Sequence, residues 1–319
     1  MATPTAQPTI CVLQEQGIPR SQFEEVLKEN GGFSVLWKVT DEEVANTTNN
    51  DKCIGIITVN KPVNESVLNQ FPNAKAVLVA FTGYGVHDIN LCKERGVKVY
   101  NVPDYSSSSV AELAIGLTLA VLREIPKGDK VLRSGGWAFS AGGNDLRGKT
   151  VGIVGTGTIG IATAKLFVAF GCKVVGWSRT EKEEFKNIGG TYVSRENLFS
   201  TCDIVSLHIP NNSETRKSIG ESDFKLLKSD AILINTARGQ ICDQEKLVEY
   251  LVAGKFRAGL DVYAVEPLPE ADAGLRSCDN VVITPHVAYK TKEALRRRAI
   301  ITSKNAMNAL SGNETNRVA

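Results

Sequence analysis

The sequence of 319 residues lacks the features that mark membrane-spanning and secreted proteins. No apolar run approaches the roughly 20 residues that a bilayer span needs. The N-terminal residues Met1–Pro8 contain neither the charged region nor the apolar region of a secretory signal. A formal net charge of only +2 gives no reason to expect nucleic acid or an anionic membrane as a partner. We therefore expect a cytoplasmic globular protein without a nucleic-acid or membrane partner.

The sequence also lacks any Cys-x-x-Cys pair among its seven cysteines, which excludes the usual spacing of zinc and redox sites. An odd number of cysteines does not suit a disulfide framework, and several lie in apolar stretches where a free thiol packs like a small core residue. The sequence predicts a reducing compartment and no metal site.

Short apolar stretches alternate with polar, helix-like stretches over residues 1–101, which predicts parallel strands with crossover helices. A helix is expected over Pro19–Lys28, and a longer one over Val110–Glu124, capped by Ser106–Ser109. The expected strands are Thr9–Leu13, Val35–Trp37, Cys53–Thr58, Ala76–Phe81 and Val97–Asn101.

A second α/β series begins at Lys149, and its strands are continuous apolar runs, as in sheets that are buried on both faces. Six strands with intervening helices are typical of a doubly wound dinucleotide-binding fold. These strands are Val151–Val154, Lys173–Trp177, Asp203–Leu207, Ala231–Asn235, Ala258–Val262 and Asn280–Ile283.

The first strand of this series runs directly into a glycine turn with the pattern Gly-x-Gly-x-x-Gly, formed by Gly155, Gly157 and Gly160. The first glycine permits a tight turn, the second lets the backbone approach a pyrophosphate, and the third lets helix and strand pack closely. A strand before this turn and a helix after it predict a dinucleotide site, with the phosphates at the helix N-terminus.

The end of the next strand indicates which dinucleotide fits. An acidic residue usually stands there and accepts hydrogen bonds from the ribose of NAD. This sequence instead has Ser178, Arg179 and Thr180. A guanidinium pairs well with a 2′-phosphate, and the hydroxyls add further donors. We expect NADP(H) to be preferred and leave NAD(H) open as the other cofactor.

Polar residues follow three later strands, in Asn235–Gly239, Asp261–Pro267 and Thr284–His286. In a parallel sheet these segments leave from one carboxyl edge, where ligands bind. Arg238, Glu266 and one of only three histidines, His286, would then meet there. Of the other two, His87 is expected to start a surface helix, and His208 to end a strand.

The combined motifs resemble the D-2-hydroxyacid dehydrogenase family along nearly the whole chain. They are Thr82–Gly85, Asn101–Ser106, Ser109–Glu112, the glycine turn, Asn235–Gly239, Asp261–Pro267 and Pro285–His286. The resemblance implies two doubly wound parallel-sheet domains. One is a Rossmann domain over residues 102–289, and the other is a flavodoxin-like substrate domain made of residues 1–101 and 290–319.

On this resemblance Arg238, Glu266 and His286 take the catalytic positions. Reduction of a 2-keto acid needs a cation for the carboxylate, a proton donor for the ketone oxygen and a hydride from nicotinamide. Arg238 would hold the carboxylate, and His286 would be the general acid, because histidine ordinarily titrates near working pH. Glu266 beside it would stabilise the imidazolium.

Further roles are implied by the same resemblance. Thr158 and Ile159 would meet the pyrophosphate. The ribose and nicotinamide would be lined by Ile209, Pro210, Thr236, Ala237 and Asp261. Two substrate-domain loops, at Asn60–Lys61 and Thr82–Gly83, would hold the substrate carboxylate through backbone N–H groups, together with Arg238 and His286.

Within the family, the loops and the Trp177–Thr180 segment look most like glyoxylate/hydroxypyruvate reductases. An NAD-dependent D-glycerate or D-lactate dehydrogenase stays open, as does a dinucleotide-sensing corepressor that binds partner peptides. Because the Val110–Glu124 helix and the loop with Trp137 are strongly apolar and this region forms a dimer interface in the family, we also expect a homodimer.

Overall fold

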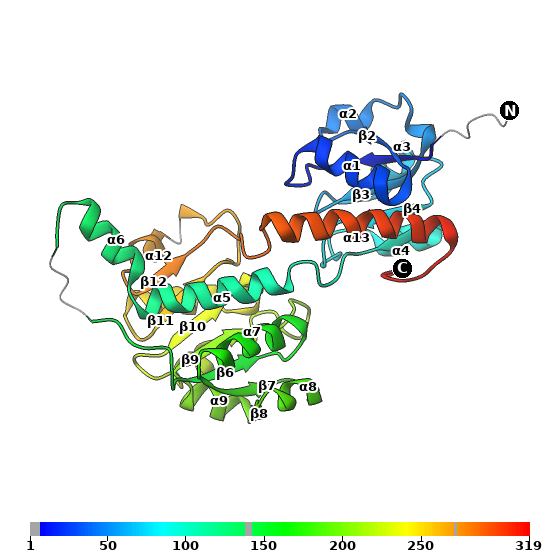
Figure 1. The fold of residues 1–319 in the computed structure, drawn as a ribbon. Helices are drawn as coiled ribbons and strands as arrows, with labels where there is room; N and C mark the ends of the chain where they lie inside the picture. Colours follow the sequence, from blue (N-terminus) through cyan, green and yellow to red (C-terminus); the bar gives the residue numbers. More distant parts are fainter. Residues whose placement is uncertain (1–6, 138–141, 271–272) are drawn as a thin grey trace. The chain divides into compact units, whose positions relative to one another are not determined.

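The computed structural model describes residues 7–137, 142–270 and 273–319 (Figure 1). The chain divides into two compact units. Unit 1 comprises Met1–Ser106 and Lys290–Ala319, and unit 2 comprises Ser107–Tyr289. The first boundary follows Ser106 rather than residue 101. The helix expected over Val110–Glu124 is α5, which spans Ser107–Leu122. It begins earlier than expected, so Ser107–Ser109 form its first turn and do not precede it as caps.

Unit 1 is built on a parallel five-stranded sheet with strand order β2-β1-β3-β4-β5, the order of the flavodoxin fold. Its strands are β1 (Thr9–Val12), β2 (Ser34–Trp37), β3 (Cys53–Thr58), β4 (Ala76–Val79) and β5 (Lys98–Tyr100). Its helices are α1 (Arg20–Gly31), α2 (Asp41–Ala45), η1 (Asn50–Lys52), α3 (Glu65–Gln70), α4 (Ile89–Glu94) and α13 (Lys292–Ser311).

Helices cover both faces of this sheet. Alternate strand residues point to opposite faces, so Ile10 and Val12 belong to one core cluster, whereas Cys11 belongs to the other. α13 packs against α1 and β4, beside which it runs in Figure 1. Unit 1 is thus assembled from both ends of the chain.

The ends of α13 show why it begins and stops where it does. Thr291 is its N-cap, and the Thr291 hydroxyl accepts a hydrogen bond from the Ala294 N–H at 3.1 Å. Gly312 follows the helix with a φ of 78°, a left-handed conformation that favours glycine.

Unit 2 is built on a parallel seven-stranded sheet with order β12-β11-β10-β9-β6-β7-β8. Its strands are β6 (Thr150–Val154), β7 (Lys173–Trp177), β8 (Thr191–Tyr192), β9 (Ile204–Leu207), β10 (Ile232–Asn235), β11 (Arg257–Leu260) and β12 (Val281–Ile283). Six of them match the predicted strands. The two-residue edge strand β8 was missed, because it is too short to show a hydrophobic pattern.

The helices of unit 2 lie on both faces of this sheet, which makes it doubly wound. α5 and α7 (Thr158–Ala169) cover one face, with α8 (Glu183–Asn187). α9 (Arg195–Thr201), α10 (Glu221–Phe224), α11 (Gln244–Val252) and α12 (Ala273–Ser277) cover the other face. The remaining helices are α6 (Ile125–Arg133) and the short η2 (Gly239–Ile241). The fold therefore confirms the predicted α/β class with two parallel sheets.

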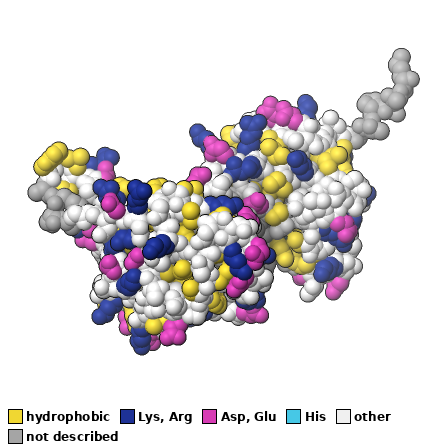
Figure 2. Space-filling view, turned by 60° about the horizontal axis from the view of Figure 1, so that its bottom comes forward, with side chains coloured by type: hydrophobic (Ala, Val, Ile, Leu, Met, Phe, Trp, Pro, Cys, Tyr) yellow, Lys and Arg dark blue, Asp and Glu magenta, His cyan; other side chains and the backbone are white. Residues whose placement is uncertain are grey.

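Most of the apolar surface of α5 packs inside unit 2, because ten residues of this helix are buried. α6 differs, since none of its residues is buried. Ile125 and Leu132 on α6 are 55% and 60% exposed, and Trp137 just beyond it is 89% exposed. Figure 2 shows hydrophobic side chains gathered at this end of unit 2, on the left.

The cysteines are all free, and only Cys278 is not fully buried. Burial raises the pKa of Cys172 and of Cys202 to about 11, so both thiols stay neutral and unreactive. In the described part of the chain, no helix is both long and apolar enough to cross a membrane.

Candidate active site and cofactor turn

The glycine turn joins β6 to α7, and two of its glycines are required by space. Gly155 has a φ of +96°, and a Cβ there would lie 2.7 Å from the carbonyl oxygen of His208. A Cβ on Gly160 would lie 2.0 Å from the carbonyl oxygen of Gly155, so no larger residue fits. Gly157, in contrast, faces open space.

The N-terminus of α7 is open to a ligand. Gly157 is its N-cap and supplies no side-chain oxygen for the first N–H groups of this 12-residue helix. Gly157 and Thr158 are exposed and Ile159 is half-buried. Free N–H groups and the positive end of the helix dipole favour an anion. The glycine turn and the N-terminus of α7 together form a cradle that fits the pyrophosphate of a dinucleotide.

A second observation supports that fit. Thr236 follows β10, and its hydroxyl oxygen is buried without a hydrogen-bond partner among the described residues. Such an orphaned group is costly unless a ligand or water completes it. Ala237 beside it is half-buried, and its N–H donates to the Asn235 side chain at 3.0 Å.

The loops after β7 and β9 flank the glycine turn, because β6 lies between these strands. Ser178 is half-buried, and Arg179 and Thr180 are exposed. Ile209 contacts the turn, since a Cβ on Gly155 would lie 2.8 Å from an Ile209 methyl carbon, and Pro210 follows it exposed.

Three contacts in this region were not predicted. Nη1 of Arg179 lies 2.5 Å from Oε2 of Glu214 in the loop after β9. The Tyr192 hydroxyl lies 2.7 Å from the Thr156 hydroxyl in the glycine turn and accepts from the Lys182 N–H at 2.8 Å. All three join segments that are at least 10 residues apart in sequence, so no local pattern reports them.

The Arg238 loop is fixed by a close approach of two backbones. A Cβ on Gly239 would lie 1.8 Å from the carbonyl carbon of Tyr263, so only glycine lets this loop pack against the segment that carries Glu266. The Asn235 side chain donates to the Arg238 carbonyl oxygen at 3.1 Å. The Arg238 side chain is half-buried, and its Nη1 donates to the Ala237 carbonyl oxygen at 2.6 Å.

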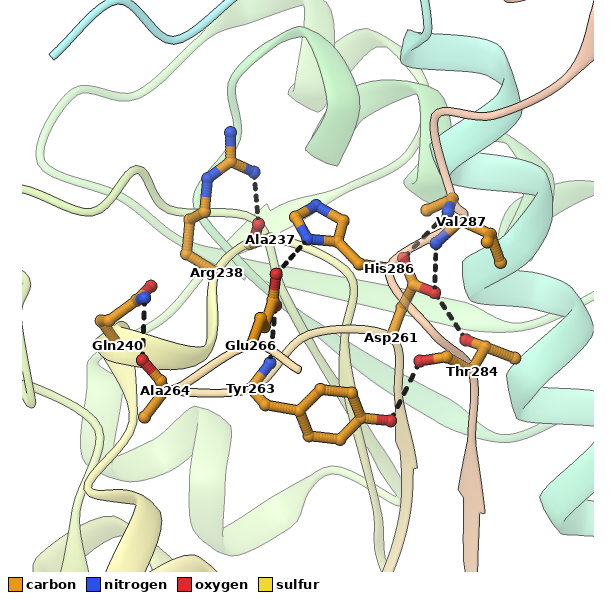
Figure 3. A network of polar contacts seen from close by, with 11 residues as sticks. Ala237, Arg238, Gln240, Asp261, Tyr263, Ala264, Glu266, Thr284, His286 and Val287 are labelled. Atoms are coloured by element: carbon orange, nitrogen blue, oxygen red, sulfur yellow. Dashed lines mark hydrogen bonds and ion pairs between the residues drawn. The ribbon is translucent and has the colours of Figure 1, made fainter. Parts of the chain in front are cut away.

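Glu266 and His286 form an ion-pair geometry at the carboxyl edge of the sheet. Nδ1 of His286 lies 2.6 Å from Oε2 of Glu266. The other carboxylate oxygen of Glu266 accepts from the Tyr263 N–H at 3.0 Å. In Figure 3 the Arg238 guanidinium and the His286 ring lie above the Glu266 carboxylate. The three predicted residues therefore follow the neighbouring strands β10, β11 and β12.

The backbone of His286 is held by Asp261. His286 has a φ of 53°, which is uncommon for a residue other than glycine, and its N–H donates to the Asp261 carbonyl oxygen at 2.8 Å. The Asp261 side chain is fully buried and accepts from the Thr284 hydroxyl at 2.6 Å and from the N–H groups of Val287 and Ala288 at 2.9 Å. Figure 3 shows these contacts with Thr284 and Val287.

Sequence reasoning assigned Asp261 to the cofactor wall and missed this anchoring geometry. The available signal was an aspartate directly after a buried strand.

Two tyrosines near His286 were also missed. The Tyr289 ring meets the His286 ring edge-on, with centroids 5.8 Å apart. The Tyr263 hydroxyl donates to the Thr284 carbonyl oxygen at 3.0 Å. Burial, followed by the charges of Asp261 and Glu266, raises the pKa of Tyr263 to about 12, so this phenol keeps its proton.

The predicted substrate loops lie in unit 1, after β3 and β4. The N–H groups of Asn60 and Lys61 already donate to the Gln14 side-chain oxygen, at 3.0 and 2.9 Å. A substrate carboxylate would have to displace Gln14 to reach them. The Lys61 ammonium lies 2.9 Å from Asp41.

The second loop is more open, because Thr82 and Gly83 are exposed. The Thr82 hydroxyl donates to the Val102 carbonyl oxygen at 3.0 Å.

A match to one family model, together with this geometry, identifies the family of the chain. The family model described as D-isomer specific 2-hydroxyacid dehydrogenase, NAD binding domain, matches residues 115–288. The chain belongs to this family of oxidoreductases.

Individual proteins that resemble this chain are named as reductases. The chain is 40% identical to a hydroxypyruvate reductase of Thermotoga maritima over 75% of its own length and 78% of the relative's. It is 39% identical to a glyoxylate reductase of Thermococcus litoralis, over 78% of both chains. An acyclic imino acid reductase, solved in complex with NADPH and D-Arg, superposes with a TM-score of 0.83 at 27% identity, covering 98% of this chain and all of the other.

Proposed function

We propose that this D-2-hydroxyacid dehydrogenase reduces a small 2-keto acid of the glyoxylate or hydroxypyruvate type to the D-2-hydroxy acid, with NADPH as the preferred cofactor. The observation that carries the proposal is the 2.6 Å contact between His286 and Glu266. These residues follow β12 and β11, and Arg238 follows the neighbouring strand β10. The names of the two relatives at 40% and 39% identity support the substrate class.

His286 is the proton donor in this proposal. Because its Nδ1 faces Glu266, its Nε2 is the atom left to give a proton to the ketone oxygen. Glu266 fixes the ring orientation and stabilises the imidazolium that precedes the transfer. The Tyr263 N–H in turn fixes the Glu266 carboxylate.

Arg238 holds the substrate carboxylate through charge-assisted hydrogen bonds and so orients the ketone. The glycine turn, Thr158 and Ile159 would hold the pyrophosphate, and Ile209, Pro210, Thr236 and Ala237 would line the rest of the dinucleotide. Bound NADPH would supply the hydride. By the family resemblance, Asn60, Lys61, Thr82 and Gly83 would bind the substrate carboxylate, with Gln14 displaced from the first loop.

The preference for NADPH rests on Arg179, supported by Ser178 and Thr180. A guanidinium meets a 2′-phosphate with strong paired hydrogen bonds, and no acidic residue stands in its place on this strand. Arg179→Ala should raise the KM for NADPH at least about tenfold and leave that for NADH nearly unchanged. Equal losses with both cofactors would contradict the preference.

The function is tested by mixing purified protein with glyoxylate, hydroxypyruvate or pyruvate and either NADPH or NADH, and following the loss of reduced nicotinamide. We expect the fastest turnover with the first two acids and NADPH, and a D product from hydroxypyruvate on chiral analysis. Faster turnover of pyruvate with NADH would instead indicate a D-lactate dehydrogenase.

We also propose that the protein is a homodimer. The support is the exposed apolar surface of Ile125, Leu132 and Trp137 on and beside α6. Light scattering at micromolar concentration should give twice the 34.5 kDa of one chain. A stable mass near 34.5 kDa would contradict the dimer.

A further inference from the structure

The residue expected to read the 2′-phosphate is already engaged by a carboxylate of the same chain. Nη1 of Arg179 lies 2.5 Å from Oε2 of Glu214. Arg179 follows β7 and Glu214 follows β9, with β6 and its glycine turn between them. The ion pair therefore joins the two loops that flank the dinucleotide cradle.

Glu214 is held in place by a built turn. The Asn212 side-chain oxygen accepts from the N–H groups of Glu214 and Thr215, at 2.9 and 3.0 Å. The Thr215 hydroxyl donates to the Pro210 carbonyl oxygen at 2.5 Å, which ties this turn to the predicted cofactor wall. The position of Glu214 is thus set by the fold and not by Arg179 alone.

The pair is weak enough to be exchanged. The Arg179 and Glu214 side chains are 72% and 66% exposed, and ion pairs at such exposure contribute little to stability. A phosphate offers more charge and more acceptor oxygens to the guanidinium than a carboxylate does. Glu181, two residues after Arg179, is engaged elsewhere, because its carboxylate lies 2.8 Å from the Lys186 ammonium.

We propose that Glu214 is a specificity-determining residue. Its carboxylate lies beside the Arg179 guanidinium, where the 2′-phosphate would bind, and this ion pair must break when a phosphorylated cofactor binds. The Glu214 carboxylate lowers the affinity for NADP(H) and leaves the affinity for NAD(H) nearly unchanged. It therefore reduces the preference for NADP(H) over NAD(H) that Arg179 creates. This inference rests on the proposed role of Arg179.

The experiment measures binding without catalysis, by titration calorimetry with 2′,5′-ADP and with 5′-AMP, which differ only in the 2′-phosphate. Glu214→Gln keeps the shape of the side chain and removes its charge. We expect it to bind 2′,5′-ADP about two- to fivefold more tightly, as the loss of an exposed ion-pair competitor allows, and to bind 5′-AMP as the wild type does. Glu214→Lys should bind 2′,5′-ADP more tightly still.

The matched control is Glu184→Gln. It also breaks an exposed ion pair of unit 2, because Glu184 lies 2.7 Å from the Lys165 ammonium with side chains 62% and 51% exposed. It changes the net charge equally but does not touch Arg179, so its affinity for 2′,5′-ADP should stay close to that of the wild type.

A double-mutant cycle with Arg179→Ala measures how far the effect of Glu214 on 2′,5′-ADP binding depends on Arg179. The gain from Glu214→Gln should disappear when Arg179 is absent. An unchanged affinity of Glu214→Gln for 2′,5′-ADP would overturn the inference and leave the preference for NADPH intact. Weaker binding of 5′-AMP by Glu214→Gln would also overturn it, since Glu214 would then be an acceptor for the ribose hydroxyls. If Arg179→Ala alone binds 2′,5′-ADP as the wild type does, both the preference and the inference fail.

Discussion

His286 and His87 lie in two different units, and their surroundings differ in exposure and in hydrogen-bond partners. His286 is partly exposed, at 28% of its side chain, and its Nδ1 lies 2.6 Å from the Glu266 carboxylate. His87 is only 6% exposed, and its Nδ1 accepts the Val63 N–H at 3.2 Å. Burial lowers the pKa of His87, so this ring is held neutral.

The two settings suit different uses of an imidazole. A ring that is open to solvent and lies beside a carboxylate suits the proton donor proposed for His286. A buried ring whose Nδ1 accepts a backbone N–H suits a structural acceptor, as at His87. The expectation that His87 starts a surface helix is wrong, because Asp88 is the N-cap of α4 and His87 lies inside the fold.

The largest expected effect concerns His286, the proton donor of the proposed mechanism. His286→Ala removes the proton donor, so kcat for keto-acid reduction should fall by about 10²–10⁴, the usual worth of a positioned acid. The measurement is steady-state reduction of glyoxylate with saturating NADPH.

Binding of 2′,5′-ADP is the control for a folded His286→Ala, because the glycine turn lies on another strand. A variant that binds this fragment normally and keeps more than about a tenth of the wild-type kcat would contradict the role of His286 as general acid.

A smaller loss should follow from loosening the support of His286. Asp261→Asn exchanges one acceptor oxygen for an NH₂ group that faces donors, so the turn that carries His286 loses hydrogen bonds. We expect kcat to fall on the order of 10- to 100-fold through misplacement of the ring. The free energy of unfolding should fall by about 1.5–3 kcal/mol, as for a buried charged acceptor.

Asp203→Asn is the matched control for Asp261→Asn. Asp203 also accepts a backbone N–H, from Thr150 at 2.8 Å, but it lies at the amino ends of β6 and β9. It should lose stability without a matching loss of kcat. Similar losses of kcat in both variants would show that Asp261 acts through stability alone.

The sequence could predict what local patterns encode. The glycine turn and six strands of unit 2 could be predicted because each is a short motif or a continuous apolar run. The positions of Arg238, Glu266 and His286 after neighbouring strands could be predicted as well, while their catalytic roles stay predictions. Parallel strand order then brings the strand ends to one edge.

The contacts that were missed join segments far apart in the chain. Glu214 meets Arg179, Gln14 occupies the N–H groups of Asn60 and Lys61, and Asp261 holds the turn at His286. Such pairs depend on strand order and loop conformation, which hydrophobic periodicity does not specify. Burial of His87 is likewise a tertiary property.

The smallest expected effect concerns His87 and its dependence on pH. Because burial lowers the pKa of His87 in the folded state, the unfolded chain takes up a proton more readily. The stability that His87 contributes is therefore complete above the unfolded pKa of about 6.5 and is lost as pH falls below it. His87→Asn offers an oxygen in place of Nδ1 for the Val63 N–H and does not titrate. Its free energy of unfolding, measured with denaturant, should thus fall less than that of the wild type between pH 7.5 and pH 5, values chosen about 1 to 1.5 units either side of that pKa.

His208 has the same kind of influence on stability, because burial lowers its pKa to about 4. Its contribution to the free energy of unfolding is therefore also lost as pH falls. It is present in both proteins, so the difference between wild type and His87→Asn cancels it. If that difference were the same at both pH values, His87 would not be held neutral by the fold.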